Sequence, residues 1–258
     1  MPECLYEKNQ MGVGFTFNRP AVYQDQWLKS WKGDKPLLDI GAGHGTNTRA
    51  ALIQGCQVVA TDLEQPDLTP WLADLPAPQQ ASATYAAARL PDHMPFADNS
   101  FCGILCSEVF HFLSNKDVIP AIAELFRILE PNGTLILTCG SYNVKALSGT
   151  GLKQQIHEHA NQSPLTFKGS FNLLQIMTQA AKQFNAPEKT TPILKEIENN
   201  NPNNNFQLFM AEQLKHAMEQ KGFIIEICEQ GDAPHYPLWV HGDQDQVRII
   251  AQKPEPSI

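Results

Sequence analysis

The stretch Leu37-Leu38-Asp39-Ile40-Gly41-Ala42-Gly43-His44-Gly45-Thr46 decides the fold class of this chain. Residues 36–40 are an apolar run typical of a buried strand, and residues 46–53 carry a helical pattern that stops before Gly55. The glycines between them allow positive φ and leave no Cβ to block a ligand. The stretch therefore predicts a strand, a turn with accessible backbone N–H groups, and a helix.

After this turn and helix, a second strand-like run at residues 57–61 is followed by Asp62. An acid about twenty residues beyond such a turn can accept hydrogen bonds from a ribose diol. The dinucleotide fingerprint GxGxxG fits poorly, because its sixth position is Thr46 and the third glycine comes one residue early. The carboxylate of Asp39 would repel a pyrophosphate but suits a cationic ligand. We therefore expect a nucleoside that carries a positive charge.

Strand-like and helical patterns alternate along most of the chain. Further strand-like runs occupy residues 101–106, 134–138 (after a turn at 131–133), 223–228 and 246–251. Helical patterns cover residues 20–31, 117–129, 170–184 and 206–220. Residues up to about 18 suggest an irregular arm, and residues 71–90 give no clear assignment. The alternation predicts βαβ units and a parallel sheet covered by helices on both faces.

Five segments in series resemble the class I S-adenosylmethionine-dependent methyltransferases. They are LLDIGAGHGTNT (37–48), VVATDLE (58–64), MPFADNSF (94–101), LCSEVFHFL (105–113) and the stretch from Glu124 to Gly133, which is similar to the family's E..R-x-L-x-PGG signature. Order and spacing hold over roughly residues 35–140. The resemblance implies S-adenosyl-L-methionine as cofactor and methyl transfer as activity.

The same resemblance implies an α/β fold, a Rossmann-like three-layer sandwich. Its seven-stranded, mostly parallel sheet would have an antiparallel last strand. Residues 1–34 would form an N-terminal arm and helix, and residues 35–258 the methyltransferase domain. Residues of about 141–205 are too many for a simple link, so we expect a helical cap insertion there, with a polar loop at 199–205 and no strand.

The resemblance also implies a set of cofactor-binding residues: Asp39, Gly41, Ala42, Gly43, Gly45, Asp62, Leu63, Leu90, Asp92 and Ser107. The family's acid-small pair that reads the adenine is replaced here by residues 89–93. Either Asp92 takes over that contact or backbone groups near Leu90 do.

The methyl acceptor should face the carboxyl ends of the strands. Glu108 and His111 follow the fourth strand, and Tyr142 follows the fifth, so these three are the candidate catalytic residues. The sulfonium donor is already activated, and a base is needed only where the nucleophile must lose a proton. In the alternative interpretation, His111 packs within its loop and Glu108 contacts the cofactor or a backbone amide.

Composition narrows the classes of partner. The net charge of −8 disfavours nucleic-acid binding, which depends on neutralising phosphates, and favours a small-molecule acceptor. The six cysteines form no CxxC pair, which indicates reduced thiols. No window approaches the ~20 apolar residues of a membrane span, and we expect a cytoplasmic protein. We expect no metal site, either at His157 and His159 or among Asp232, His235 and His241.

Other functions remain open at this point. The altered adenine region is compatible with a catalytically silent S-adenosylmethionine-binding module that acts through a partner. An RNA or protein methyltransferase and a nicotinamide-dependent dehydrogenase are further alternatives. The sequence does not indicate the oligomeric state.

Overall fold

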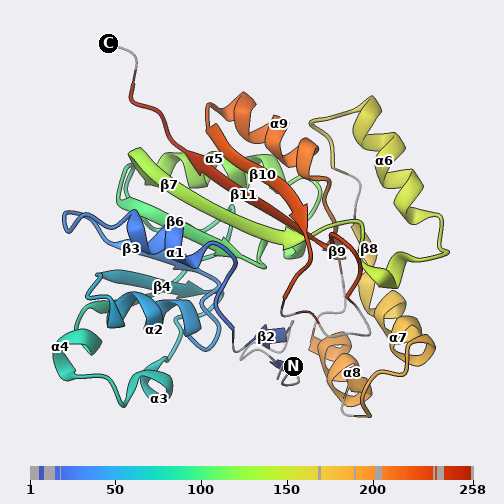
Figure 1. The fold of residues 1–258 in the computed structure, drawn as a ribbon, viewed down its shortest axis with the longest axis horizontal. Helices are drawn as coiled ribbons and strands as arrows, with labels where there is room; N and C mark the ends of the chain where they lie inside the picture. The colour runs from blue at the N-terminus through green and yellow to red at the C-terminus, as the bar shows by residue number, and fades with distance from the viewer. Residues whose placement is uncertain are drawn as a thin grey trace.

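The computed structural model describes residues 6–8, 15–17, 19–167, 170–188, 190–200, 205–234, 236 and 241–256. Its centre is a seven-stranded sheet (Figure 1). In spatial order the strands are β10 (Ile224–Gly231), β11 (Gln246–Gln252), β7 (Leu129–Gly140), β6 (Phe101–Ser107), β3 (Leu37–Ile40), β4 (Val58–Asp62) and β5 (Ala83–Ala87). Only β11 runs antiparallel to its neighbours within this sheet. The predicted mostly parallel sheet with an antiparallel last strand is confirmed.

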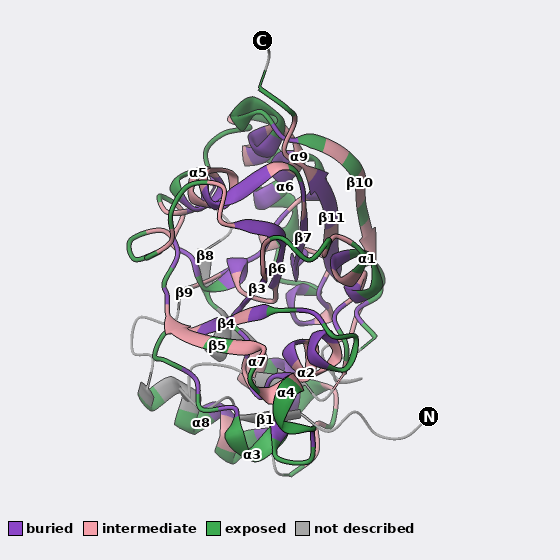
Figure 2. Cartoon of the chain, turned by 90° about the vertical axis from the view of Figure 1, so that its left-hand side faces the viewer, coloured by how far each residue is buried: buried purple, intermediate pink, exposed green. Residues whose placement is uncertain are grey.

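Helices cover both faces of the sheet, because its central strands are apolar on both sides. In β6, Ile104 and Cys106 pack into one core and Leu105 into the other, as the two-residue period of a strand requires. Cys102 also packs into the second core, because the register of β6 shifts between Phe101 and Gly103. The first core includes residues of α5 (Val118–Ile128) and α9 (Ala211–Lys221). The second includes residues of α1 (Gln24–Lys29), α2 (Thr46–Ile53) and α3 (Thr69–Leu72). Figure 2 shows the buried strands between the more exposed helices.

The glycine turn follows β3, as expected, and α2 follows the turn. The third strand of the parallel part, β5, lies in the stretch that the sequence left unassigned, preceded by α3 and α4 (Ala77–Gln80). The expected turn at residues 131–133 is instead part of the long strand β7, where Asn132 has a φ of 61°. The helix expected over residues 20–31 is shorter and spans α1 alone.

Between β7 and α9 the described residues form the helices α6 (Leu152–Gln162), α7 (Leu173–Gln183) and α8 (Thr190–Asn200). They lie beside the carboxyl end of β7 (Figure 1). A third apolar cluster lies here, with Leu147, Ile156, Ala180 and Leu194 among its buried side chains. The short helix η2 (Lys145–Leu147) leads into this segment.

Three expectations about irregular segments are wrong. A two-stranded sheet pairs β8 (Ser170–Asn172) with β9 (Asn205–Gln207), where no strand was expected. Helix α8 extends to Asn200, into the expected polar loop. The N-terminal arm contains β1 (Tyr6–Lys8) paired with β2 (Phe15–Phe17). Each of these strands has three residues, too few for a periodic signal, and long-range pairing forms the β8–β9 sheet.

Candidate active site

The backbone of the glycine turn is left-handed at Gly41, Gly43 and Gly45, with φ of 71°, 55° and 76°. A Cβ at Gly41 would lie 2.6 Å from Cγ2 of Val109. The turn therefore needs glycine both for its conformation and for its close approach to the loop after β6.

Asp62 joins the end of β4 to this turn. Its Oδ2 accepts a hydrogen bond from the Gly43 amide at 3.2 Å, and its Oδ1 accepts one from the Leu63 amide at 2.8 Å. Burial raises the pKa of Asp62, against the lowering effect of these two amides. The carboxylate is thus oriented by backbone groups at the rim of the cavity described next.

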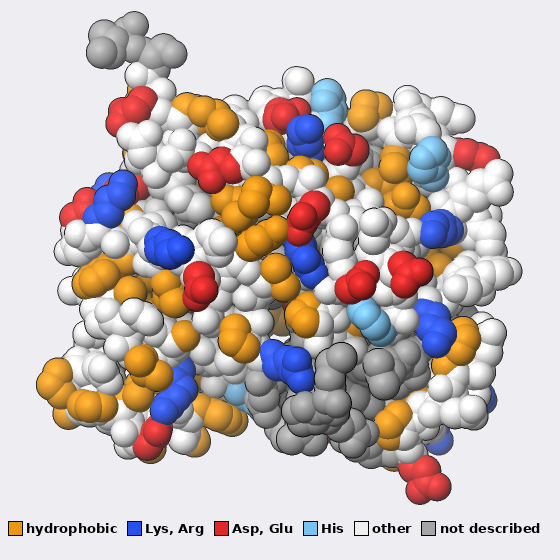
Figure 3. All heavy atoms as spheres, viewed as in Figure 1, with side chains coloured by type: hydrophobic (Ala, Val, Ile, Leu, Met, Phe, Trp, Pro, Cys, Tyr) orange, Lys and Arg blue, Asp and Glu red, His pale blue; other side chains and the backbone are white. Residues whose placement is uncertain are grey.

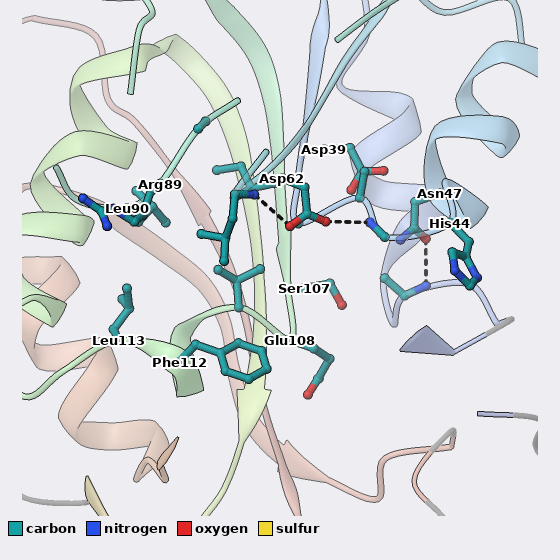
Figure 4. Close-up of a pocket in the computed structure, with 18 of the residues that line it drawn as sticks. Asp39, His44, Asn47, Asp62, Arg89, Leu90, Ser107, Glu108, Phe112 and Leu113 are labelled. Atoms are coloured by element: carbon teal, nitrogen blue, oxygen red, sulfur yellow. Dashed lines mark hydrogen bonds between the residues drawn. The ribbon is translucent and has the colours of Figure 1, made fainter. Parts of the chain in front are cut away.

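A cavity of about 440 Å³ opens at the carboxyl ends of β3, β4 and β6. In Figure 4, Leu90 and Leu113 lie at one end, His44 and Asn47 lie at the other, and Asp62 and Ser107 lie between them. Ten of the residues proposed from the sequence line it: Asp39, Gly41, Ala42, Gly43, Asp62, Leu63, Leu90, Asp92, Ser107 and Glu108. The topology therefore gathers residues from four separate segments around one cavity.

Asp39 is the most deeply buried acid of the cavity wall, with a relative exposure of 2%. Its Oδ2 accepts a hydrogen bond from the Thr48 hydroxyl at 2.7 Å. Burial raises the pKa of Asp39 to about 6, although its hydrogen bonds with Thr48 lower it. Such a carboxylate ionises more readily when a cation lies next to it.

The region that replaces the usual adenine-reading acid also lines the cavity. Leu90 is buried there, whereas Asp92 is exposed and lies 3.7 Å from Nη2 of Arg89. Both alternatives for the adenine contact, the Asp92 carboxylate and the backbone near Leu90, are thus within the same wall.

Glu108 follows β6 with a φ of 59°, an uncommon conformation for a residue other than glycine. Its Oε2 accepts a hydrogen bond from the Tyr236 hydroxyl at 2.6 Å. Its Oε1 accepts hydrogen bonds from Nε2 of Gln246 at 2.7 Å and from the Thr138 hydroxyl at 3.2 Å. The hydroxyls of Ser107 and Thr138 are 2.9 Å apart, which extends this network to the cavity floor.

His111 lies behind Glu108 rather than in the cavity wall. Its Nδ1 is 3.6 Å from Oε2 of Glu108, and its ring stacks on Phe206 with centroids 4.1 Å apart. Phe112, which does line the cavity, meets the His111 ring edge-on at 4.4 Å. His111 is therefore placed to support Glu108 and Phe112.

Two further sequence-proposed residues do not line the cavity. Gly45 caps the start of α2, where a Cβ would lie 2.8 Å from Cδ1 of Leu68. Tyr142 packs against the third apolar cluster, with Nζ of Lys153 5.5 Å from its ring centroid. The chain turns away from the cavity after β7, and this turn carries Tyr142 with it.

Sequence reasoning missed several residues of the site. Arg19, His44 and Asn47 line the cavity, and Oδ1 of Asn47 accepts a hydrogen bond from the Ala21 amide at 2.9 Å. Tyr236 reaches Glu108 from the connection between β10 and β11. His44 and Asn47 could have been predicted, because they lie next to the glycines in the sequence. No local sequence feature marks Arg19 or Tyr236.

Two of the motifs recognised in the sequence meet in space through Arg127. Its guanidinium donates to the carbonyl oxygen of Phe96 at 2.7 Å and pairs with Asp98 at 2.9 Å and with Glu124 at 2.7 Å. These contacts tie the loop before β6 to helix α5. The motifs therefore support the scaffold of the site rather than the cavity itself.

The surface shows mixed charge on the face drawn in Figure 3, where basic side chains are interspersed with acidic ones. Within the described ranges no helix is long and apolar enough to cross a membrane. The same ranges hold no group of three metal-ligating side chains suited to an ion. His241 instead contacts the buried Asp245, with Nδ1 and Oδ2 2.8 Å apart. Of the three residues weighed for a metal in this connection, His235 lies outside the described residues.

Comparison with known proteins agrees with this architecture. Residues 38–137 match a family described as a methyltransferase domain. The chain is 29% identical over 129 residues to an uncharacterized protein of Haemophilus influenzae, covering 48% of this chain and 51% of that one. It is 30% identical over 148 residues to the biotin biosynthesis bifunctional protein BioHC of Cellvibrio japonicus, covering 57% and 27%. It is 32% identical over 99 residues to an uncharacterized methyltransferase of Mycobacterium tuberculosis, covering 38% and 37%.

Solved structures share the fold. A SAM-dependent methyltransferase from Methanosarcina mazei aligns with a TM-score of 0.54 at 18% identity, covering 88% of this chain and 96% of that one. The Burkholderia thailandensis 1,6-didemethyltoxoflavin-N1-methyltransferase aligns with a TM-score of 0.53 at 14% identity, covering 91% and 80%. Residues 38–137 thus match a methyltransferase domain, and the fold is that of S-adenosylmethionine-dependent methyltransferases of known structure. The chain spans about half or less of the length of the curated relatives it matches.

Proposed function

We propose that this chain binds S-adenosyl-L-methionine in the cavity beside the glycine turn and transfers its methyl group to a small-molecule acceptor. One observation carries this proposal. Asp39 and Asp62 lie on adjacent strands and both border the cavity. Gly41 lines the same cavity, and a Cβ there would displace the side chain of Val109.

The residues present fit the charge of this cofactor. The sulfonium and ammonium groups of the cofactor are cationic. Burial opposes the ionisation of Asp39, and a nearby cation would stabilise its carboxylate. Asp62 is oriented to accept hydrogen bonds from the ribose hydroxyls. Arg19 lines the same cavity and supplies a positive charge for the methionine carboxylate. When bound, the cofactor supplies an activated methyl group, and the chain's task is alignment and exclusion of water.

Several features support a small acceptor. The cavity of about 440 Å³ is shared by donor and acceptor, which leaves limited room beside the donor. We propose that residues of about 141–205, which hold α6, α7 and α8, act as a cap over the acceptor. Structural neighbours include enzymes named for small molecules, 1,6-didemethyltoxoflavin and geranyl diphosphate.

Calorimetry with S-adenosylhomocysteine tests the cofactor part of the proposal. We expect micromolar binding and no binding of NAD(P). Absence of S-adenosylhomocysteine binding would remove the proposal, and stabilisation by NAD(P) alone would favour a dehydrogenase.

The acceptor part requires a transfer experiment. The protein is incubated with a cell lysate and methyl-labelled S-adenosylmethionine, and the products are separated by size. Label in the small-molecule fraction is the expected result. Label in protein or RNA would overturn the small-acceptor proposal, and cofactor binding with no transfer to any fraction would indicate a silent binding module.

A further inference from the structure

The acceptor end of the cavity can be located from the order of the strands. Strand β3 lies between β4, which ends in the proposed ribose-binding Asp62, and β6, which ends in Ser107. Glu108 therefore lies across the glycine turn from the ribose side. Figure 4 shows Glu108 and Phe112 in the cavity wall, away from both His44 and Leu90. On the proposed function, this is the side to which the methyl group is offered.

The Glu108 carboxylate is held in one orientation by side chains from three parts of the chain. Tyr236 donates to one oxygen, and Gln246 and Thr138 donate to the other. Tyr236 is partly buried, and burial of its hydroxyl together with the nearby Glu108 raises its pKa well above the ordinary value, so the phenol keeps its proton and acts as a donor. Donors of this kind stabilise the ionised form of the carboxyl that accepts them.

The base of the connection that carries Tyr236 is itself fixed. Asp245 is fully buried and accepts hydrogen bonds from the Ala233 amide at 2.7 Å and from the Gly242 amide at 2.8 Å. The Tyr236 amide donates to the Ala233 carbonyl oxygen at 3.3 Å. The contact of Tyr236 with Glu108 is thus built on an ordered support.

The surroundings of Glu108 favour one class of acceptor. A carboxylate attracts a protonated or N–H-bearing nitrogen and repels carboxylates and phosphates. Phe112 is 37% exposed and offers an aromatic surface beside it, which suits an apolar body or the face-on approach of a cation. The arginines of the cavity wall, Arg19 and Arg89, come instead from the segment before α1 and the segment after β5.

We infer that Glu108, held by Tyr236 and Gln246 next to Phe112, forms an acceptor site for an amine with an apolar body, and not for a phosphorylated or carboxylated acceptor. This inference rests on the proposed function and names its substrate class. Glu108 is the residue that contacts the acceptor, and Tyr236 is a positioning residue that acts through it.

The transfer step balances with these groups alone. An amine that binds as its ammonium form first gives one proton to the Glu108 carboxylate, which passes it to solvent. The neutral amine then attacks the methyl carbon with its lone pair, the carbon–sulfur bond breaks, and its electrons remain on sulfur to give the neutral thioether. The new N-methyl group leaves the nitrogen positively charged. One proton then passes from that nitrogen to the Glu108 carboxylate and on to solvent.

The test uses the full chain loaded with S-adenosylhomocysteine, so that the donor site is filled. Dissociation constants for benzylamine, benzyl alcohol, benzoate and benzyl phosphate are measured by ligand-observed NMR titration. These probes share a ring and differ in the group that would face Glu108. We expect benzylamine to bind at least about tenfold more tightly than benzyl alcohol, and the two anions to bind more weakly still.

Variants test whether Glu108 causes the preference for benzylamine over benzyl alcohol. Glu108→Gln should bring the benzylamine-to-benzyl alcohol ratio close to one, whereas the control Glu212→Gln, on the exposed side of α9, should leave it unchanged. Tyr236→Phe keeps the ring and removes the donor, so the ratio should fall by about threefold to tenfold without loss of benzyl alcohol binding. A merely structural role for Tyr236 would weaken both probes equally.

Three results would overturn the inference. They are equal or tighter binding of the anions, no benzylamine preference, and an unchanged preference in Glu108→Gln. If Glu108→Gln does not fold, Tyr236→Phe decides the question by the same ratio. Failure of S-adenosylhomocysteine to bind at the outset would remove the proposed function as well, whereas its binding without an amine preference would remove this inference alone.

Discussion

The proposed donor and acceptor ends of the cavity are built from different kinds of contact. At the donor end, residues close in sequence meet: Thr48 contacts Asp39, nine positions away, and Gly43 contacts Asp62, nineteen positions away. At the acceptor end, Glu108 meets Tyr236 and Gln246, which are 128 and 138 positions away. The donor end is thus a property of one βαβ unit, whereas the acceptor end depends on the complete sheet and the connection between its last two strands.

The two ends also differ in how their carboxylates are solvated. The buried Asp39 is poorly solvated until a ligand supplies a cation, whereas Glu108 is already surrounded by hydrogen-bond donors. We therefore expect substitutions at the donor end to change cofactor affinity strongly and those at Glu108 to change it little. Substitutions at the two ends test this difference.

Gly43→Val should abolish measurable S-adenosylhomocysteine binding. The side chain would fill the space beside the turn and strain a φ of 55°, at a cost of about 1–3 kcal/mol for the backbone alone. The matched control is Gly55→Val, which has a φ of 80° and open space around its Cβ. Gly55→Val has the same kind of backbone strain but fills no space at the proposed cofactor site, so its affinity for S-adenosylhomocysteine should match that of the wild type. Equal losses of affinity in both variants would contradict a cofactor site at Gly43.

Asp62→Ala should weaken S-adenosylhomocysteine binding by about 3 kcal/mol, on the order of a hundredfold, since two charge-assisted hydrogen bonds to the ribose are lost. Calorimetry measures this change. Glu64→Ala, an exposed acid two residues further on, is the control and should have no effect. An unchanged affinity in Asp62→Ala would show that the donor end has been placed on the wrong strand.

Asp39→Asn should weaken S-adenosylhomocysteine binding about tenfold at pH 8, where a cationic ammonium group meets a neutral amide instead of a carboxylate. Because the folded-state pKa of Asp39 is raised to about 6, wild-type affinity should fall as the pH drops below about 6, and the variant should show a flatter profile. Asp34→Asn, at an exposed position before β3, is the control. Identical pH profiles for wild type and variant would contradict this role.

The same substitution has a second consequence for the ligand-free protein. A carboxyl whose folded-state pKa is raised costs stability as the pH rises from the unfolded value of about 4 to about 6, and that cost persists above it. Asp39→Asn should therefore be more stable than wild type at pH 8 by about 1–3 kcal/mol and show no gain at pH 4. Denaturant titrations at the two pH values measure this difference.

Glu108→Gln is expected to give the smallest change in cofactor affinity, less than about threefold, because the amide keeps the shape and part of the hydrogen bonding of the carboxylate. Methyl transfer should fall far more than binding. A loss of cofactor affinity as large as that of Asp62→Ala would mean that Glu108 belongs to the donor end, and the contrast between the two ends would disappear.

Much of the donor end was predictable from the sequence. The strand, glycine turn and helix at residues 36–53 and the acid at Asp62 give signals within short windows, and backbone rules require them to meet at one edge of a parallel sheet. Gly45, predicted to bind the cofactor, does not line the cavity, and spacing alone does not distinguish a turn-forming glycine from one that faces a ligand. The segment of about residues 141–205 was predictable only as a helical segment of a certain length, and the short strands β8 and β9 were not.

Local sequence patterns predicted most strands of the sheet, although not β5, and the charge of the proposed donor site, because periodicity, glycine conformation and right-handed crossovers act over short stretches of chain. Only the tertiary structure decided which side chains surround Glu108. Tyr236 lies in a connection with no regular pattern, and it reaches Glu108 because the antiparallel β11 inserts between β7 and β10 and brings that connection to the end of β6. Contacts of this kind depend on the whole sheet being assembled, so no local stretch of sequence specifies them.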